Sequence, residues 1–158
     1  MKWILFFLIG CLLINADTSF AQKKNIESGF YHIVNSGGQI MVMQSEHDGV
    51  IEARRTYRIS KKPFCSIREI NSVEIDSSYC YQGMASIKLT LNKKGASIIK
   101  EVSKKYINKK IAFVINSKII SMPVFMSEIE NGRLDLSGIF SIVQSKKIVQ
   151  DINNEIKH

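Results

Sequence analysis

The hydrophobic positions of the chain change period several times, and each period predicts an element. The stretch SIKLTL at residues 86–91 alternates, with its isoleucine and two leucines on one face, which predicts a half-buried strand. Asn92 then stands where the N-cap of a helix belongs, and apolar residues recur at helical spacing through residues 93–106. Lysines occupy the opposite face. The pattern therefore predicts a strand followed by an amphipathic helix.

An unbroken apolar run follows this helix. KIAFVI at residues 110–115 predicts a strand, Asn116 and Ser117 predict a turn, and KIIS at 118–121 returns toward Pro123. Proline cannot donate to a strand ladder, so the returning strand must end there or lie at an edge. This second pair of elements reads as a hairpin.

The C-terminal part predicts one more strand and one more helix. GRLDLSG at residues 132–138 alternates between two glycines, which is typical of a short strand. Ser141 and Gln144 form the spacing of a capping box, and the residues after them carry one apolar stripe.

The N-terminal part predicts strands. Two apolar segments at 30–34 and 39–44 flank Asn-Ser-Gly-Gly, which favours a β-hairpin. A second turn at 47–49 leads into further strands up to residue 59. Ser66 caps a short helical turn, and residues 72–76 alternate as a strand. The fold class expected is α+β: a mixed or antiparallel sheet with two amphipathic helices on one face, preceded by an N-terminal β-hairpin region.

Residues 1–21 have the pattern of a secretory signal peptide. One lysine precedes an uncharged apolar run, and Ser19 and Ala21 are small residues at the positions that favour cleavage after residue 21. No later run reaches the roughly 20 apolar residues of a membrane span. We therefore expect a periplasmic or secreted protein with no transmembrane helix after signal removal. The stretch LIGC, ending at Cys11, resembles a lipoprotein cleavage box, so a lipoprotein is the alternative.

The remaining residues suit one domain. We expect a flexible leader at 22–28 and a single α+β domain at 29–158. The net charge of the chain is +8, which favours either anionic envelope surfaces and acidic polypeptides or simply a solvated lysine face. Nucleic acid is not expected, because basic residues are not interleaved with aromatic ones.

The residues that could carry chemistry are few. Cys65 and Cys80 would form a disulfide in an oxidising compartment, and two buried thiols are the alternative. The three histidines are isolated and no closely spaced cysteine pair exists, so neither a metal site nor a cofactor is predicted. No nucleophile motif such as GxSxG occurs, so no catalytic residue is predicted.

The order of elements from residue 86 to residue 157 resembles the periplasmic P1 head domain of SecD, an accessory subunit of the preprotein translocase. Residues 57–76 resemble the segment before that head more loosely. The matching elements include Asn92, Gly95 and Ala96, the strand and turn at 111–117, Ser121 to Pro123, Ile129, Gly132, Ser137, Gly138, Phe140 and Ser141. Met122 departs from the family, in which a small alanine is usual.

The resemblance implies a head-domain fold and contact with a polypeptide or with an envelope protein, such as a Sec-related one, on the far side of the inner membrane. It does not imply energy coupling, because the membrane helices to which that step is attributed are not present in this sequence. The function expected is a non-catalytic polypeptide-binding or translocation accessory module. Its proposed surface combines the hairpin tip, Met122, Pro123 and Phe125 with the nearby edge of the sheet. An exposed edge can accept an extended peptide by strand addition, and flexible methionine and aromatic side chains adapt to varied sequences. The alternative for Met122 and Phe125 is ordinary core packing.

Two other functions stay open at this point. A self-associating structural envelope protein would use the same sheet edge, and the oligomeric state is not predicted. A periplasmic enzyme of unknown reaction would need His32 or His47 to converge on a carboxylate such as Glu74 or Asp76.

Overall fold

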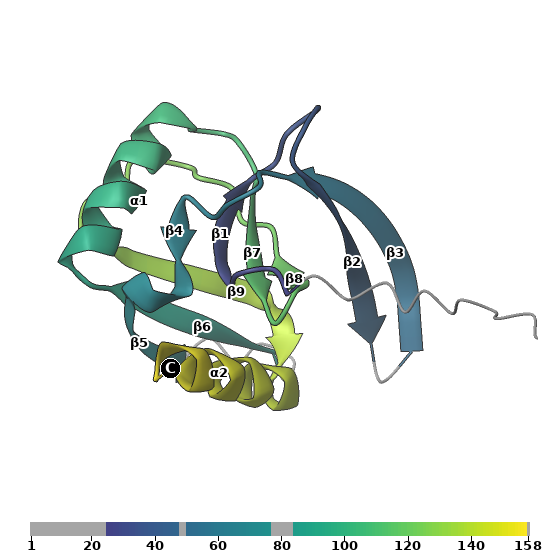
Figure 1. The fold of residues 1–158 in the computed structure, drawn as a ribbon. Helices are drawn as coiled ribbons and strands as arrows, with labels where there is room; N and C mark the ends of the chain where they lie inside the picture. The colour runs from purple at the N-terminus through teal and green to yellow at the C-terminus, as the bar shows by residue number, and fades with distance from the viewer. Residues whose placement is uncertain (1–24, 48–49, 77–83, 158) are drawn as a thin grey trace, which may run out of the picture.

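The computed structural model describes residues 25–47, 50–76 and 84–157 (Figure 1). Its elements in chain order are β1 (Gly29–His32), β2 (Gln39–His47), β3 (Val50–Ile59), β4 (Cys65–Ser66), the 3-10 helix η1 (Ile67–Glu69), β5 (Ile70–Asp76), β6 (Met84–Leu91), α1 (Lys93–Lys105), β7 (Ile111–Ile115), β8 (Lys118–Ser121), β9 (Arg133–Ser141) and α2 (Ile142–Ile156). Within the described ranges every strand pairing is antiparallel. The α+β class is confirmed.

A four-stranded sheet in the order β4-β1-β7-β8 lies at the centre of the molecule. All five residues of β7 are buried. Alternate residues of this strand face different hydrophobic clusters: Phe113 belongs to the larger cluster and Val114 to the smaller one. Both faces of the sheet are therefore covered, which explains why the run KIAFVI has no polar alternation.

The larger cluster fills the space between the central sheet, the three-stranded sheet β5-β6-β9 and the two helices. Ile99 of α1 and Ile152 of α2 are both fully buried in it, together with Leu89 of β6. The opposite face of the three-stranded sheet is polar. It carries Lys88 and Asp135, which lie opposite each other on β6 and β9 and are both exposed. The sheet is thus half-buried, as the alternation in SIKLTL predicted.

The hairpin β2–β3 covers the other face of the central sheet. Met41 and Ile59 of the hairpin pack in the smaller cluster with Tyr31, Val114 and Ile119. Figure 1 shows α1 along one side of the molecule and this hairpin on the opposite side. The hairpin pairs along its whole length, from Gln39 with Ile59 to His47 with Val50.

The expected hairpin between residues 30–34 and 39–44 is wrong. β1 pairs with β4 and β7, whereas β2 pairs with β3. Gly37 and Gly38 do have positive φ, at 65° and 69°, so the turn chemistry was correctly predicted. The turn connects two different sheets because the next strand along the chain supplies a longer partner for β2.

Residues 25–28, expected to belong to a flexible leader, are held against the domain. The Ser28 hydroxyl donates to Glu155 Oε1 at 2.9 Å and accepts from the Asn116 N–H at 3.1 Å. The Ile26 N–H donates to Ser117 Oγ at 2.9 Å. These four residues are therefore part of the fold, and the expected signal peptide and the first residues of the leader lie outside the described ranges.

The local signals at the helix ends are confirmed. Asn92 Oδ1 accepts from the Gly95 N–H at 2.9 Å, and Ser141 and Gln144 form both bonds of a capping box. Ser66 caps η1. In the part of the chain that the structure describes, neither helix has the length and apolarity needed to cross a bilayer.

Candidate polypeptide-binding site

The segment after β8 pairs with the segment before β7. The Asn108 N–H donates to the Phe125 carbonyl at 2.7 Å, and the Ile111 N–H donates to the Pro123 carbonyl at 3.0 Å. Lys110 and Val124 form an isolated antiparallel bridge. β8 ends at Ser121, before the proline, as predicted. Pro123 takes part in the pairing through its carbonyl, so the N–H that a proline lacks is not needed there.

The side chains of this segment alternate between core and surface. Phe125 is 3% exposed and packs in the larger cluster, whereas Val124 is 37% and Met126 76% exposed. Met122 is half-buried against the smaller cluster. The expected surface of Met122, Pro123 and Phe125 therefore requires correction: Phe125 is a core residue, and the exposed apolar side chains are its two neighbours.

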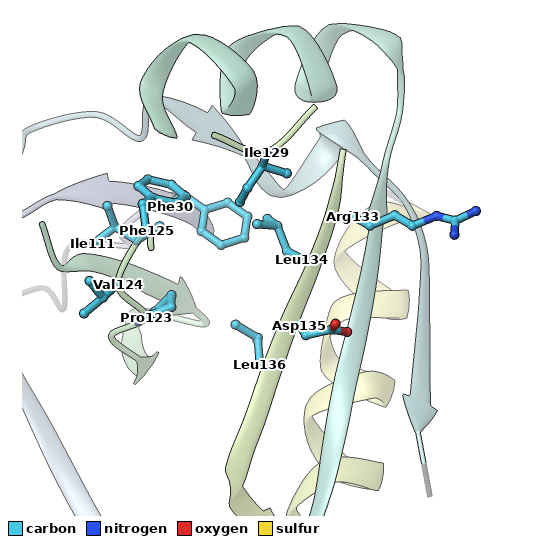
Figure 2. A pocket seen from close by; sticks show the side chains of 10 residues that line it. All are labelled: Phe30, Ile111, Pro123, Val124, Phe125, Ile129, Arg133, Leu134, Asp135 and Leu136. Atoms are coloured by element: carbon cyan, nitrogen blue, oxygen red, sulfur yellow. The ribbon is translucent and has the colours of Figure 1, made fainter. Parts of the chain in front are cut away.

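An apolar cavity of about 110 Å³ lies between this segment and β9. It is lined by Phe30, Ile111, Pro123, Val124, Phe125, Ile129, Arg133, Leu134, Asp135 and Leu136. Figure 2 shows that Leu134 and Leu136 point toward the cavity from β9, whereas Arg133 and Asp135 point away from it. The cavity surface is thus mainly hydrocarbon, contributed by two separate sheets and the chain between them.

β9 is an edge strand. It is the last strand in the order β5-β6-β9, and in the described part of the chain it pairs with β6 alone. In Figure 2, β6 lies on the far side of β9 from Pro123 and Val124. The edge of β9 away from β6 therefore faces the cavity side, where its backbone groups could pair with an extended chain.

Two of the predicted motif glycines allow the close approach that positions β9. A Cβ atom on Gly95 would lie 2.8 Å from the Glu69 Cβ, and one on Gly132 would lie 2.6 Å from the Ala96 Cβ. Gly132 also has a φ of 64°. A hydrogen bond from Lys94 to the Glu69 carboxylate, at 2.6 Å, ties η1 to α1 and lowers the pKa of Glu69. The small residues at the start of α1 thus bring η1 and the start of β9 into contact with the helix.

The family described as "SecDF, P1 head subdomain" matches residues 39–153. The chain belongs to this family. The match to the SecDF P1 head begins at β2 and therefore includes the hairpin β2–β3. The resemblance seen in the sequence over residues 86–157 did not include this hairpin. No curated protein matches the chain in sequence.

Solved SecDF structures share the fold of this P1 head. One, described as "Structure and function of a membrane component SecDF that enhances protein export", superposes with a TM-score of 0.59 at 14% identity, over 84% of this chain and 64% of its own. Another, SecDF in a "Super-membrane-facing form", gives a TM-score of 0.58 at 15% identity, over 78% of this chain and 18% of its own. The chain thus spans less than two thirds of either structure.

The remaining motif residues of this P1 head lie at the N-caps of the two helices and within β9. Asn92 and Ser141 are the N-caps described above. Gly138 falls within β9, where the register with β6 shifts between Ala85 and Ile87.

The predicted disulfide stays a prediction. Cys65 is fully buried in the larger cluster, and burial raises the pKa of its thiol to about 12. A free Cys65 thiol would therefore be a poor nucleophile at neutral pH. Cys80 and Cys11 both lie outside the described residues.

The histidine that could have supported an enzyme is packed between aromatic rings. The His32 ring lies 4.5 Å from the ring of Phe64 and 4.5 Å from that of Tyr106. Burial, and then the Lys105 charge, lower the pKa of His32. Asp76 forms an ion pair with Lys88, with 2.5 Å between Nζ and Oδ2. His47 has no described side chain. Among the described residues, no group of three or more His, Cys, Asp and Glu could hold a metal ion.

Sequence reasoning missed Val124, Leu134 and Leu136 as residues of the site. The two leucines were assigned correctly to a strand, but the alternation does not say what lies opposite them. The predicted binding surface included Phe125 and did not include Val124. The alternation of side chains along an extended segment could have shown that the neighbours of a buried Phe125 point outward.

Proposed function

We propose that this SecDF P1 head protein is a non-catalytic accessory of protein export that binds extended polypeptide segments beside β9. The observation that carries the proposal is the apolar cavity between the free edge of β9 and the Pro123–Val124 segment. We place the protein on the far side of the inner membrane, as the expected signal peptide suggests.

The geometry supports recognition of an extended chain more than that of a small molecule. Pockets for small ligands have volumes of roughly 300–1,000 Å³, and this cavity has about 110 Å³. Such a space suits one inserted apolar side chain. The free edge of β9 would supply main-chain hydrogen bonds that do not depend on the sequence of the bound segment. Leu134, Leu136 and Val124 would supply apolar contact for varied side chains.

The export role rests on the family. One similar solved structure is described as a membrane component that enhances protein export. This chain spans only 64% of that structure. A role of this chain in protein export is therefore part of the proposal.

The test compares two exposed neighbours. Binding of a fluorescent, permanently unfolded polypeptide is measured by anisotropy with the wild type, Val124→Arg and Met126→Arg. Val124 lines the cavity and Met126 is not among the lining residues, although it is the more exposed of the two. We expect Val124→Arg to weaken binding at least tenfold, about 1.4 kcal/mol, and Met126→Arg to change it little.

The proposal fails if the wild type does not bind the unfolded polypeptide, or if both variants bind as the wild type does. Light scattering on the same samples addresses self-association. A dimer that Val124→Arg dissociates, with no polypeptide binding by the wild type, would favour the structural envelope protein instead, because edge strands also pair with copies of themselves.

A further inference from the structure

Lysines are concentrated at one end of the molecule, where α1 ends and the chain passes to β7. Four of them lie within residues 104–110, and two more lie just before Pro63. All six are exposed: Lys61, Lys62, Lys104, Lys105, Lys109 and Lys110. Figure 1 shows the end of α1 and the chain leading to β7 at the top of the view.

Aromatic packing brings the two lysine segments together. The His32 ring contacts both Phe64, which follows Lys62 by two residues, and Tyr106, the C-cap of α1. Lys105 Nζ lies 5.6 Å from the Tyr106 ring centroid. His32 is paired with Ile111, the residue after Lys110. Each of the six lysines, which we call the lysine end, therefore lies within four residues of Phe64 or Tyr106 along the chain.

The charge of the lysine end is not neutralised within the described residues. The ion pairs among the described residues use Lys88, Lys94 and Lys100. The lysines of the lysine end take part in none of them, and Glu101 is the nearest carboxylate along α1. A helix C-terminus favours cations, which accounts for Lys104 and Lys105. It does not account for Lys61, Lys62, Lys109 and Lys110, which lie outside the helix.

An apolar side chain projects from the same end. Ile107 is 44% exposed, although it lies between Tyr106 and Lys109 in a segment where the other exposed residues are polar. A surface of several lysines around an exposed isoleucine has the composition of an interfacial membrane-binding patch, in which lysines attract anionic headgroups and the apolar side chain enters the interface.

We propose that the lysine end docks this protein on an anionic lipid bilayer, with Ile107 inserted at the headgroup level. All six cations are lysines, which act as point charges, and none is an arginine, whose planar fork recognises carboxylates in two-point contacts. The described cavity is lined by none of them. Diffuse lysine charge outside the described cavity fits a plane of mobile headgroups better than an acidic polypeptide. The inference does not rest on the proposed polypeptide binding.

The test is flotation of the purified full chain with vesicles of phosphatidylcholine alone or mixed with phosphatidylglycerol, without any peptide. We expect binding to the mixed vesicles only, weakened by salt. Lys109→Gln with Lys110→Gln should reduce the affinity by about 25-fold, from roughly fivefold for each lysine. Ile107→Ser should reduce it further.

The matched control is Lys146→Gln with Lys147→Gln, an adjacent and exposed lysine pair on α2 with the same change of charge. It should keep most of the affinity. Equal losses in both double variants would show that only net charge matters and would overturn the proposal. So would the absence of binding to mixed vesicles, or binding of polyglutamate through Lys109 and Lys110 without vesicle binding. Thermal unfolding of each variant verifies that it is folded.

Discussion

At the scale of single residues, Gly132 and Gly37 have nearly the same backbone conformation but different surroundings. Gly132 combines a φ of 64° with a hypothetical Cβ only 2.6 Å from the Ala96 Cβ. Gly37 has almost the same φ, 65°, but no heavy atom lies within 4 Å of its hypothetical Cβ. The pair separates two reasons for a glycine: backbone conformation alone, and backbone conformation together with close packing.

We predict that Gly132→Ala lowers the free energy of unfolding by about 2–4 kcal/mol, since it adds a steric conflict to the left-handed backbone cost. Gly37→Ala should cost only about 1 kcal/mol, the backbone part. Urea unfolding of both variants measures the difference.

A double variant tests whether the contact with Ala96 causes the loss of stability in Gly132→Ala. Adding Ala96→Gly to Gly132→Ala removes the atom that the new methyl group would meet, so part of the loss should be recovered despite the cost of glycine within a helix. Strictly additive losses would show that the contact with Ala96 is not the reason for Gly132.

At the scale of elements, the sequence was most informative where the signal and its consequence lie within a few residues. The N-caps at Asn92 and Ser141 and the alternation of β6 depend on neighbours along the chain, and all were predicted correctly. The partner of β1 is different. β1 pairs with β7, about 80 residues away, and a strand that is apolar throughout gives no indication of which strand lies beside it. The burial of Phe125 is likewise decided by distant residues.

The attachment of residues 25–28 belongs to this scale, because Ser28 joins three elements. Its side chain bonds to α2 and to the turn between β7 and β8, and its carbonyl accepts from the Ile67 N–H of η1. We predict that Ser28→Ala lowers the free energy of unfolding by about 1–3 kcal/mol, because the Asn116 N–H loses its partner in a place where Ser28 is 3% exposed.

Ser127→Ala is the control for that variant, since Ser127 is exposed and the same atoms are removed. Its effect should stay within about 0.5 kcal/mol. If denaturant unfolding gives equal values for the two variants, residues 25–28 do not contribute to the stability of the fold.

At the scale of the whole molecule, the central sheet separates two hydrophobic clusters of unequal size. The larger joins both helices to two sheets, and the smaller is covered on one side by the hairpin β2–β3, with Ile26 and Met122 also packed against it. The hairpin contacts the rest of the molecule through one face, because Ile40 and Val42 on its other face are 58% and 46% exposed. An element that contacts the rest of a domain through only one of its faces, and through a small hydrophobic cluster, is expected to open before the rest of the domain.

We therefore predict that amide hydrogens of β2 and β3 exchange through a partial opening, at a lower free energy than those of β7, which require global unfolding. Two core substitutions test this coupling. Met41→Ala destabilises the native state, by about 2 kcal/mol, relative to both the partly open and the unfolded states, so exchange should accelerate in the hairpin and in β7. Ile152→Val, in the larger cluster, should accelerate exchange in β7 only, since that cluster persists when the hairpin opens. Equal acceleration of the hairpin by Ile152→Val would mean that the two clusters unfold as one cooperative unit, and that the central sheet does not divide the molecule energetically.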